Sequence, residues 1–200
     1  MTQIDPSGPE QLPPTPSHTV GPFYGCALPF RGGEDIAPLG HPDTITVHGY
    51  VVDGAGEPLP DALVELWGAR PDGAVPQVDG SLRPDPATGG HLGRNGVEFT
   101  GWGRSQTDAD GHWYARTLRP GARGRSAPYV SVCVFARGLL MHLFTRIYLP
   151  GDEAALAADP LLSRLGDRRD TLIADAEGPA LHRFDIRLQG EGETVFLEYQ

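Results

Sequence analysis

Short apolar runs separated by tight turns limit the fold of this chain more than any other feature of its sequence. Glycine accounts for 27 and proline for 20 of its 200 residues, and many of them stand between runs of alternating polarity. Proline lacks a backbone donor and glycine supplies the backbone conformations that tight turns require, so both residues end helices and strands. Such a density of turn residues is typical of many short strands joined by tight connections.

This pattern predicts an all-β chain with one short helical stretch. The expected strands are Thr44–Val52, Ala62–Trp67, His112–Thr117, Pro128–Ala136, Met141–Leu149, Leu181–Leu188 and Thr194–Tyr199. Turn signals stand at Asp53–Gly56 and Asp108–Gly111. Asp152–Arg168 is the expected helical stretch, broken by Pro160, and Asp79–Gly96 is a glycine-rich excursion without periodicity. We therefore expect a single-domain β-sandwich of two mixed or antiparallel sheets.

The N-terminal segment has a different character. Residues 1–22 contain six prolines and no strand or helix periodicity, so this segment cannot pair as a central strand. We interpret residues 1–22 as an extended N-terminal arm and residues 23–200 as the sandwich domain. An arm of this kind can cover a large area of a partner when it docks.

Charge and cysteine content exclude several classes of protein. The formal net charge of −10 argues against nucleic acid or an anionic membrane as the main partner, and all 16 basic residues are arginine. Cys26 and Cys133 lie far apart in sequence, and a thiol in an apolar strand, such as that of Cys133, usually behaves as a small buried hydrophobe. No run resembles a membrane span or a secretory signal, so we expect a cytoplasmic protein.

The residues alone assign no catalytic motif. The 7 histidines include no His-x-His pair and no His-x-x-x-His pair, the spacings that put two metal ligands on one face. Asp108 and Asp110 resemble the start of a calcium loop, but the glycine and distal glutamate of that loop are absent. Gly101 and Gly103 lack the third glycine of a dinucleotide site, and no nucleophile elbow is present.

Aromatic and aliphatic residues of the expected strands divide into two groups. The expected core residues are Trp67, Phe135, Ile147, Tyr148, Phe184 and Ile186. Trp102 and Trp113 fit either the core or a subunit interface, where tryptophan is enriched.

Several longer segments, taken together, carry a family resemblance. They are Thr15–Phe23, Leu63–Trp67, Gly103–Ser105, Thr107–Gly111, Leu118–Gly121, Phe135–Gly138, Arg183–Gly190 and Glu193–Phe196. This set resembles the intradiol ring-cleaving dioxygenases over nearly the whole chain after residue 14. Its arm, its Phe135–Gly138 corner and its C-terminal segments resemble the alpha chain of those members that are built from two homologous chains, alpha and beta.

The resemblance implies a division of labour between two chains. In the two-chain members the catalytic beta chain holds Fe(III) through two tyrosines and two histidines. Such an enzyme cleaves 3,4-dihydroxybenzoate with O₂ to 3-carboxy-cis,cis-muconate, in aromatic catabolism through the β-ketoadipate pathway. This chain would then be one subunit of a hetero-oligomeric dioxygenase. It would not be catalytic alone, and Fe(III) would lie in the homologous beta subunit.

The positions that match the iron ligands of the family are substituted here. They are Val75, Arg123, Tyr129 and Ser131. One phenolate cannot replace a set of four ligands, and Arg123 would put a fixed positive charge where the ferric ion sits. We therefore expect no metal ligands and no catalytic residues in this chain.

The resemblance also implies that this chain helps to form the substrate pocket at the alpha–beta interface. The matching substrate-binding residues are Thr19, Gly21, Pro22, Phe23 and Arg137. Pro22 and Phe23 can give an aromatic acid an apolar wall, and the planar guanidinium of Arg137 can pair with a carboxylate. Alpha chains often have tyrosine at the position of Phe23, so its hydroxyl is either lost here or supplied by the adjacent Tyr24.

Two alternative functions stay open. A catalytically inactive β-sandwich binding module could have kept this fold and lost the reaction, because one fold serves many functions. A self-sufficient dioxygenase with unusual ligands would have to accommodate Arg123 beside its metal. The arm and Arg137 favour the alpha subunit, because a free binding module has no obvious use for residues that cover the site of a partner.

Overall fold

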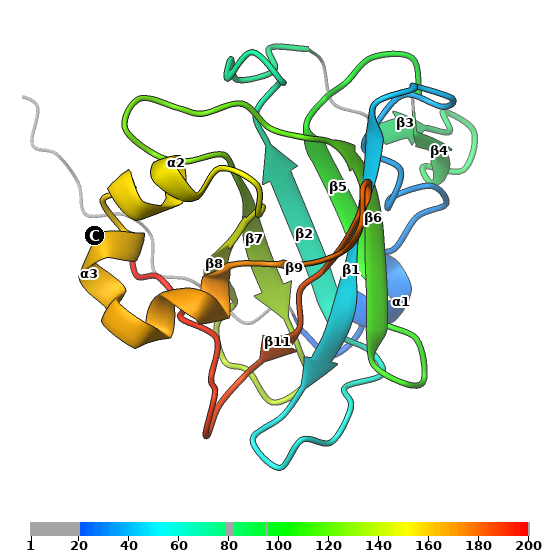
Figure 1. Cartoon of the computed structure of the whole chain (residues 1–200). Helices are drawn as coiled ribbons and strands as arrows, with labels where there is room; N and C mark the ends of the chain where they lie inside the picture. The colour runs from blue at the N-terminus through cyan, green and yellow to red at the C-terminus, as the bar shows by residue number, and fades with distance from the viewer. Residues whose placement is uncertain (1–20, 79–81, 95, 200) are drawn as a thin grey trace, which may run out of the picture.

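A computed structural model describes residues 21–78, 82–94 and 96–199, and all of its strands except those of one small hairpin form two sheets packed face to face (Figure 1). The first sheet contains β1 (Thr44–Val52), β6 (His112–Leu118), β9 (Asp175–Gly178), β10 (Leu181–Arg183) and β11 (Ile186–Arg187). The second sheet has the spatial order β5 (Trp102–Gln106), β2 (Leu63–Gly68), β7 (Tyr129–Phe135) and β8 (Leu143–Tyr148). The predicted β-sandwich is confirmed, and β1 has the predicted bounds.

β1 is the central strand of the first sheet and is paired along both edges. β6 runs antiparallel to β1, whereas β10 and β11 run parallel to it along its other edge, so this sheet is mixed. The predicted turns beside β1 and β6 are confirmed. Asp53 Oδ1 accepts hydrogen bonds from the amides of Ala55 (2.8 Å) and Glu57 (2.9 Å), and Asp108 Oδ1 accepts an equivalent pair before β6.

The prediction of one strand over Leu181–Leu188 is wrong, because the structure divides this segment into β10 and β11. At the break, the Phe184 amide donates to the His48 carbonyl at 2.7 Å. Gly49 lies opposite the break, and a Cβ at that position would collide with the Phe184 carbonyl. The glycine therefore allows the backbone of residues 184–185 to approach β1 more closely than a regular strand would.

The core fills the space between the sheets, and strand alternation decides which side chains enter it. On β7, Val130, Val132 and Val134 are at most 2% exposed, and the residues between them are only half-buried. The predicted burial of Ile147, Phe184 and Ile186 in this core is confirmed. Tyr148 is buried as predicted, but it lies in a second cluster with Leu156, Leu162 and Leu172 of the helical segment. Trp113 is 1% exposed, which assigns it to the core.

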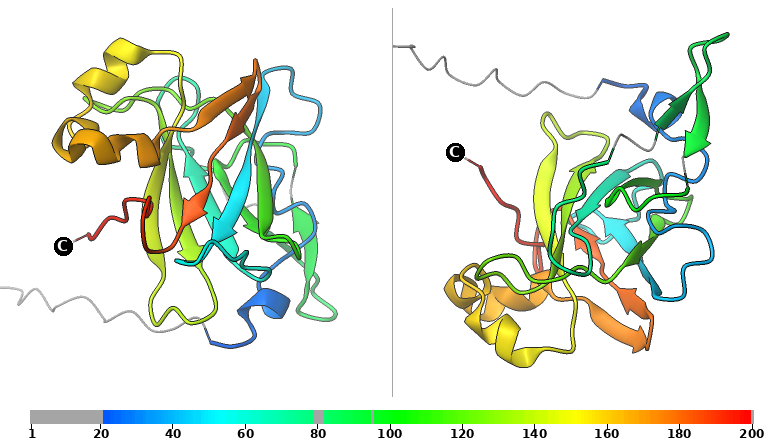
Figure 2. Two further views of the ribbon diagram at one scale, coloured as in Figure 1. Left: turned by 60° about the horizontal axis from the view of Figure 1, so that its bottom comes forward. Right: turned by 90° about the horizontal axis from the view of Figure 1, so that it is seen from above.

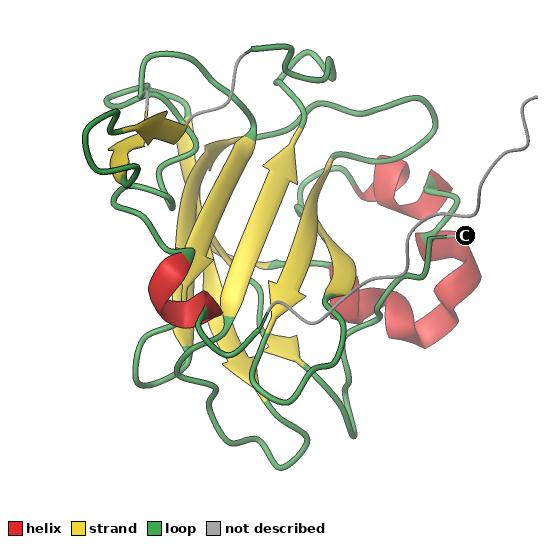
Figure 3. Cartoon of the chain, turned by 180° about the vertical axis from the view of Figure 1, so that it is seen from behind, coloured by secondary structure: helices red, strands yellow, loops and turns green. Residues whose placement is uncertain are grey.

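Two predicted core residues lie on the outer face of the second sheet instead. Trp67 is 54% exposed and Phe135 is only half-buried, because alternation along β2 and β7 turns both away from the core. Trp102 of β5 is half-buried on the same sheet and stacks on Phe30, with ring centroids 5.8 Å apart. Figure 3 shows this sheet from the side opposite to that of Figure 1.

The predicted helical stretch and its interruption near Pro160 are confirmed. It consists of α2 (Glu153–Ala158), α3 (Leu162–Leu165) and the 3₁₀ helix η1 (Gly166–Leu172). Asp159, fully buried, accepts hydrogen bonds from the amides of Leu161 (2.8 Å), Leu162 (3.0 Å) and Ala127 (2.9 Å) and so joins the helices to the loop before β7. Among the described residues, no helix is long and apolar enough to cross a membrane.

Two further segments differ from their predicted structure. The Asp79–Gly96 excursion contains a hairpin of β3 (Leu82–Pro84) and β4 (His91–Arg94), which lies at the side of the sandwich away from α2 and α3 (Figure 2). Thr194–Tyr199 is not a regular strand; Leu197 makes an isolated bridge to Phe144. The bridge of Leu197 depends on a distant part of the chain, which local periodicity does not report. The short α1 (Tyr24–Ala27) precedes β1.

Replacing Gly49 with alanine should destabilise the fold, because the new methyl group must displace the backbone at Phe184. We expect a loss of about 1–3 kcal/mol, which lowers Tm by roughly 2–12 °C in a domain of this size. Calorimetry checks the value. The control is Gly178→Ala, where the new Cβ would meet the Leu181 side chain at an ordinary 3.7 Å. Equal melting of Gly49→Ala and the unmodified chain would contradict the close approach.

Candidate functional site

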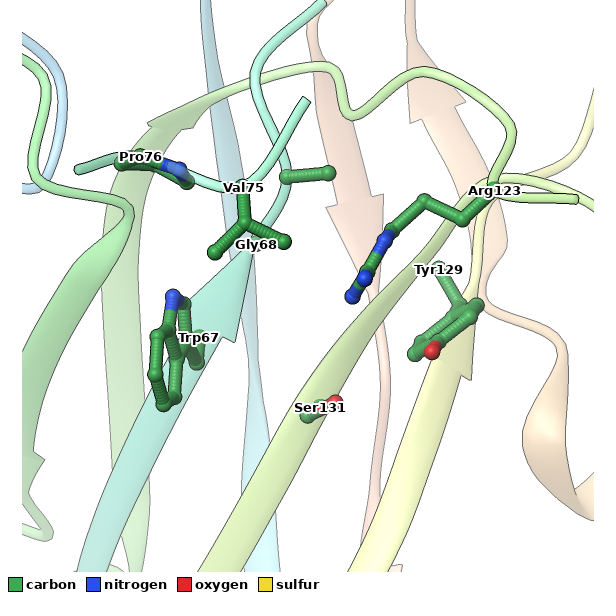
Figure 4. A pocket seen from close by; sticks show the side chains of 8 residues that line it. Trp67, Gly68, Val75, Pro76, Arg123, Tyr129 and Ser131 are labelled. Carbon is green, nitrogen blue, oxygen red and sulfur yellow. The ribbon is translucent and has the colours of Figure 1, made fainter. Parts of the chain in front are cut away.

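A pocket of about 260 Å³ lies where β2 ends and β7 begins, and all four positions that match the family's iron ligands line it (Figure 4). Its lining residues are Trp67, Gly68, Ala69, Val75, Pro76, Arg123, Tyr129 and Ser131. Tyr129 and Ser131 alternate on the outer face of β7, and Trp67 lies opposite Ser131 on β2. Figure 4 shows the Arg123 side chain extending from its loop toward the middle of the pocket.

Val75 lies in the loop after β2 and Arg123 in the loop before β7. Glycines let the backbones of these two loops come into contact. The Gly121 amide donates to the Arg70 carbonyl at 3.0 Å, which joins the loop before β7 to the loop after β2. A Cβ on either Gly73 or Gly121 would collide with the backbone of the opposite loop. The glycines therefore fix the distance between the loops, and with it the width of the pocket.

The donor set of the pocket does not fit a ferric ion. Val75 offers no ligand atom, Ser131 offers a neutral hydroxyl, and Arg123 brings a permanent positive charge. The Arg146 guanidinium lies 4.1 Å from the centre of the Tyr129 ring and adds a second positive charge beside the one phenol. Elsewhere in the described ranges, no group of three or more His, Cys, Asp or Glu side chains could hold a metal.

The arm residues predicted to contact substrate are described only in part. Thr19 lies outside the described residues. Gly21 has a left-handed backbone with φ of +84°, and Pro22 and Phe23 are exposed, Phe23 by 74%. Tyr24 follows Phe23 at the start of α1, and its side chain is 6% exposed. Tyr24 and Phe23 therefore occupy different environments, and the Tyr24 hydroxyl does not take the position of a hydroxyl on Phe23.

Arg137 forms an ion pair with Asp61, a residue that the sequence patterns did not connect with the site. Its Nη2 and Nε donate to Asp61 Oδ2 at 2.6 and 3.1 Å. The Arg137 side chain is 76% exposed, so Asp61 holds one edge of the guanidinium while the rest faces solvent. Asp61 stands after a proline in the loop before β2, where an aspartate ordinarily indicates only a turn.

Tyr24 completes a small cluster with Asp61 and Arg137. Burial raises the pKa of the Tyr24 hydroxyl, the charge of Asp61 raises it further, and the charge of Arg137 opposes this shift. The Tyr24 hydroxyl and Asp61 Oδ1 are both buried, and neither has a hydrogen-bond partner of good geometry among the described residues. This cluster connects the residue that follows Phe23 with Arg137, so the end of the arm and Arg137 lie in one region.

A second, more apolar hollow of about 330 Å³ lies on the outer face of the second sheet. Its lining includes Trp67, Trp102, Cys133 and Phe144. Burial, with a smaller contribution from the nearby charge of Glu65, raises the pKa of the Cys133 thiol to about 12. This cysteine therefore stays protonated near neutral pH. Exposed aromatic surface of this kind is typical of an interface with another protein.

Comparison with known proteins now assigns the family. The family model described as Dioxygenase matches residues 30–190. The chain therefore belongs to the dioxygenase family that cleaves aromatic rings in the intradiol mode.

Within this family, three curated relatives are informative. The chain is 37% identical to the protocatechuate 3,4-dioxygenase alpha chain of Burkholderia cepacia, over 94% of this chain and 98% of that one. It is 35% identical to the alpha chain of Pseudomonas putida, over 95% and 98%. Identity to the beta chain of Burkholderia cepacia is 32%, over 83% and 78%.

Solved structures show the same fold. The dioxygenase domain of a carbohydrate-binding fusion from Streptomyces sp. SirexAA-E has a TM-score of 0.55 and 25% identity, covering 89% of this chain and 99% of that one. Catechol 1,2-dioxygenase from Pseudomonas arvilla C-1 has a TM-score of 0.51 and 24% identity, covering 78% and 55%.

Replacing Asp61 with asparagine should lower the pKa of Tyr24 from its raised value, because the variant removes a negative charge beside the hydroxyl. The charge of Arg137, which lowers the pKa, would then act unopposed by Asp61. An NMR titration of ¹³Cζ-labelled tyrosine measures the change, with Tyr24→Phe to assign the signal. The control is Asp170→Asn on η1, whose carboxylate is 84% exposed. An unchanged Tyr24 titration in Asp61→Asn would contradict the cluster.

Proposed function

We propose that this chain is the non-iron-binding alpha subunit of a protocatechuate 3,4-dioxygenase and pairs with an Fe(III)-bearing beta subunit. One observation carries the proposal. The pocket at the family's iron position contains Arg123, Val75 and Ser131, in a chain that is similar to alpha chains over 94% of its length. The complex would open the ring of 3,4-dihydroxybenzoate between its hydroxyl-bearing carbons and add both atoms of O₂. The partner's Fe(III) would supply the chemistry that activates the catechol.

This chain's own residues would bind and orient the substrate. The free edge of the Arg137 guanidinium would pair with the substrate carboxylate, and Asp61 would hold the guanidinium in position through its two hydrogen bonds. Pro22 and Phe23 would give the ring an apolar wall and exclude water, and the Thr19 hydroxyl would hydrogen-bond to the substrate. The exposure of Phe23 and Arg137 supports these roles, because both side chains are accessible to a ligand on a partner.

The exposed apolar surface supports an alpha–beta hetero-oligomer. Phe23 is 74% exposed, and Trp102, Cys133 and Phe144 line the apolar hollow on the outer face of the second sheet. Burying such residues against a second sandwich would stabilise both chains at about 25 cal/mol for each Å² of apolar surface. The chain without its partner should therefore be less stable than the complex.

Co-expression with a beta subunit tests the proposal. We expect the two chains to co-purify in equal amounts and to convert 3,4-dihydroxybenzoate. When the beta subunit is omitted, we expect this chain to have no dioxygenase activity. Turnover by this chain alone would show a self-sufficient enzyme. A stable chain that never associates with a beta subunit would favour the inactive binding module.

Replacing Arg137 with alanine in the complex should raise KM for 3,4-dihydroxybenzoate about 10- to 100-fold, the effect of losing a charge-assisted hydrogen bond of about 1.5–3 kcal/mol. KM for catechol, which lacks the carboxylate, should change little. Steady-state oxygen uptake measures both values. The control is Arg164→Ala on α3, an exposed arginine of the helical segment. Equal losses for the two substrates would remove Arg137 from carboxylate binding.

A further inference from the structure

We propose that the pocket lined by Trp67, Val75, Arg123, Tyr129 and Ser131 binds a small aromatic carboxylate of the benzoate class and holds it without reaction. The site goes beyond the function proposed above, because every lining residue belongs to this chain and neither iron nor a partner residue is needed. Its basis is the combination of an unpaired cation, two hydroxyl groups and apolar walls in one hollow of about 260 Å³.

The pocket carries local positive charge in a chain whose net charge is −10. Among the described residues, no carboxylate oxygen lies within 4.0 Å of the Arg123 or Arg146 guanidinium nitrogens. By contrast, Arg104, Arg116 and Arg137 each pair with an aspartate or glutamate. The Arg123 side chain is exposed and extends toward the middle of the pocket in Figure 4. A bound carboxylate would therefore supply the negatively charged partner that Arg123 lacks within this chain.

Arg146 strengthens this preference for a negative ligand. Its guanidinium lies over the Tyr129 ring at 4.1 Å and donates to the Tyr148 hydroxyl at 3.2 Å. Its Nε is buried and has no hydrogen-bond partner in the described part of the chain. A cation against the ring favours negative charge near the Tyr129 hydroxyl, which can donate to a carboxylate oxygen.

The apolar walls indicate an aromatic ligand rather than an inorganic anion. Trp67 is 54% exposed and Val75 is 38% exposed, so both present apolar surface to the pocket. An aromatic ring stacked on the Trp67 indole would cover that surface, which phosphate or chloride cannot do. Pockets for drug-sized ligands usually measure about 300–1,000 Å³, so this smaller pocket suits a single ring with a carboxylate.

Titration calorimetry with benzoate tests the site, because benzoate has the ring and the charge but no catechol hydroxyls. The alpha–beta complex is titrated as the unmodified protein, as Arg123→Gln and as Arg125→Gln. Arg125 lies two residues further along the same loop, is exposed, and does not line the pocket. We expect Arg123→Gln to weaken benzoate binding at this site about tenfold or more, and Arg125→Gln to leave it unchanged.

A second variant separates the ring from the charge. Trp67→Leu should weaken benzoate binding several-fold and leave the weak binding of phosphate unchanged, because only the aromatic acid uses the indole wall. Equal affinity for benzoate and benzyl alcohol would overturn the role of Arg123, and equal affinity for benzoate and phosphate would overturn the aromatic class. Unchanged benzoate binding in Arg123→Gln would overturn the site itself.

The same titration distinguishes this site from the proposed substrate pocket. Arg137→Ala should reduce benzoate binding at the alpha–beta interface but not at the Arg123 site, so the two losses should be separate and additive. Because the pocket needs no partner residue, the chain without a beta subunit is titrated as well. If the subunit proposal fails, this chain should still show the Arg123-dependent binding and no Arg137-dependent binding. Failure of the inference would remove any effect of Arg123→Gln.

Discussion

Side chains alternate along β7, the strand between β2 and β8, and both the core and the pocket depend on that alternation. Val130, Val132 and Val134 point inward and hold the two sheets together, while Tyr129 and Ser131 point outward and line the pocket. Outward side chains of such a strand lie outside the core between the sheets, so their chemistry can change without disturbing that core. This separation explains how a dioxygenase fold persists around a pocket that does not fit iron.

The parts of the structure that depend on neighbouring residues could be predicted from the sequence. Strand β1 and the turns at Asp53 and Asp108 follow from alternation and from local hydrogen bonds to the backbone. The division between β10 and β11 could not be predicted, because it depends on the close approach of Gly49 to a segment more than 100 residues away. Asp61 beside Arg137 was missed for the same physical reason, since only the folded chain brings the two together.

The candidate site shows the same division. The motif resemblance identified Val75, Arg123, Tyr129 and Ser131, and the structure brings these four residues to one pocket. Periodicity alone assigned Trp67 to the core, yet it forms a wall of that pocket, because β2 can bury only one of its faces between the sheets. Electrostatics then decides what the pocket can hold: two arginines repel a ferric ion and attract an anion.

If this chain is the non-iron-binding subunit, iron in the complex lies only in the partner subunit, and anomalous diffraction can locate it. Crystals of the complex would be measured above and below the iron absorption edge, so that the difference map locates iron separately in the two homologous sandwiches. We expect one strong peak for each pair of chains, in the partner subunit, and none beside Tyr129 of this chain. A peak of comparable height between Tyr129 and Arg123 would show that this chain binds iron and is not the non-iron-binding subunit.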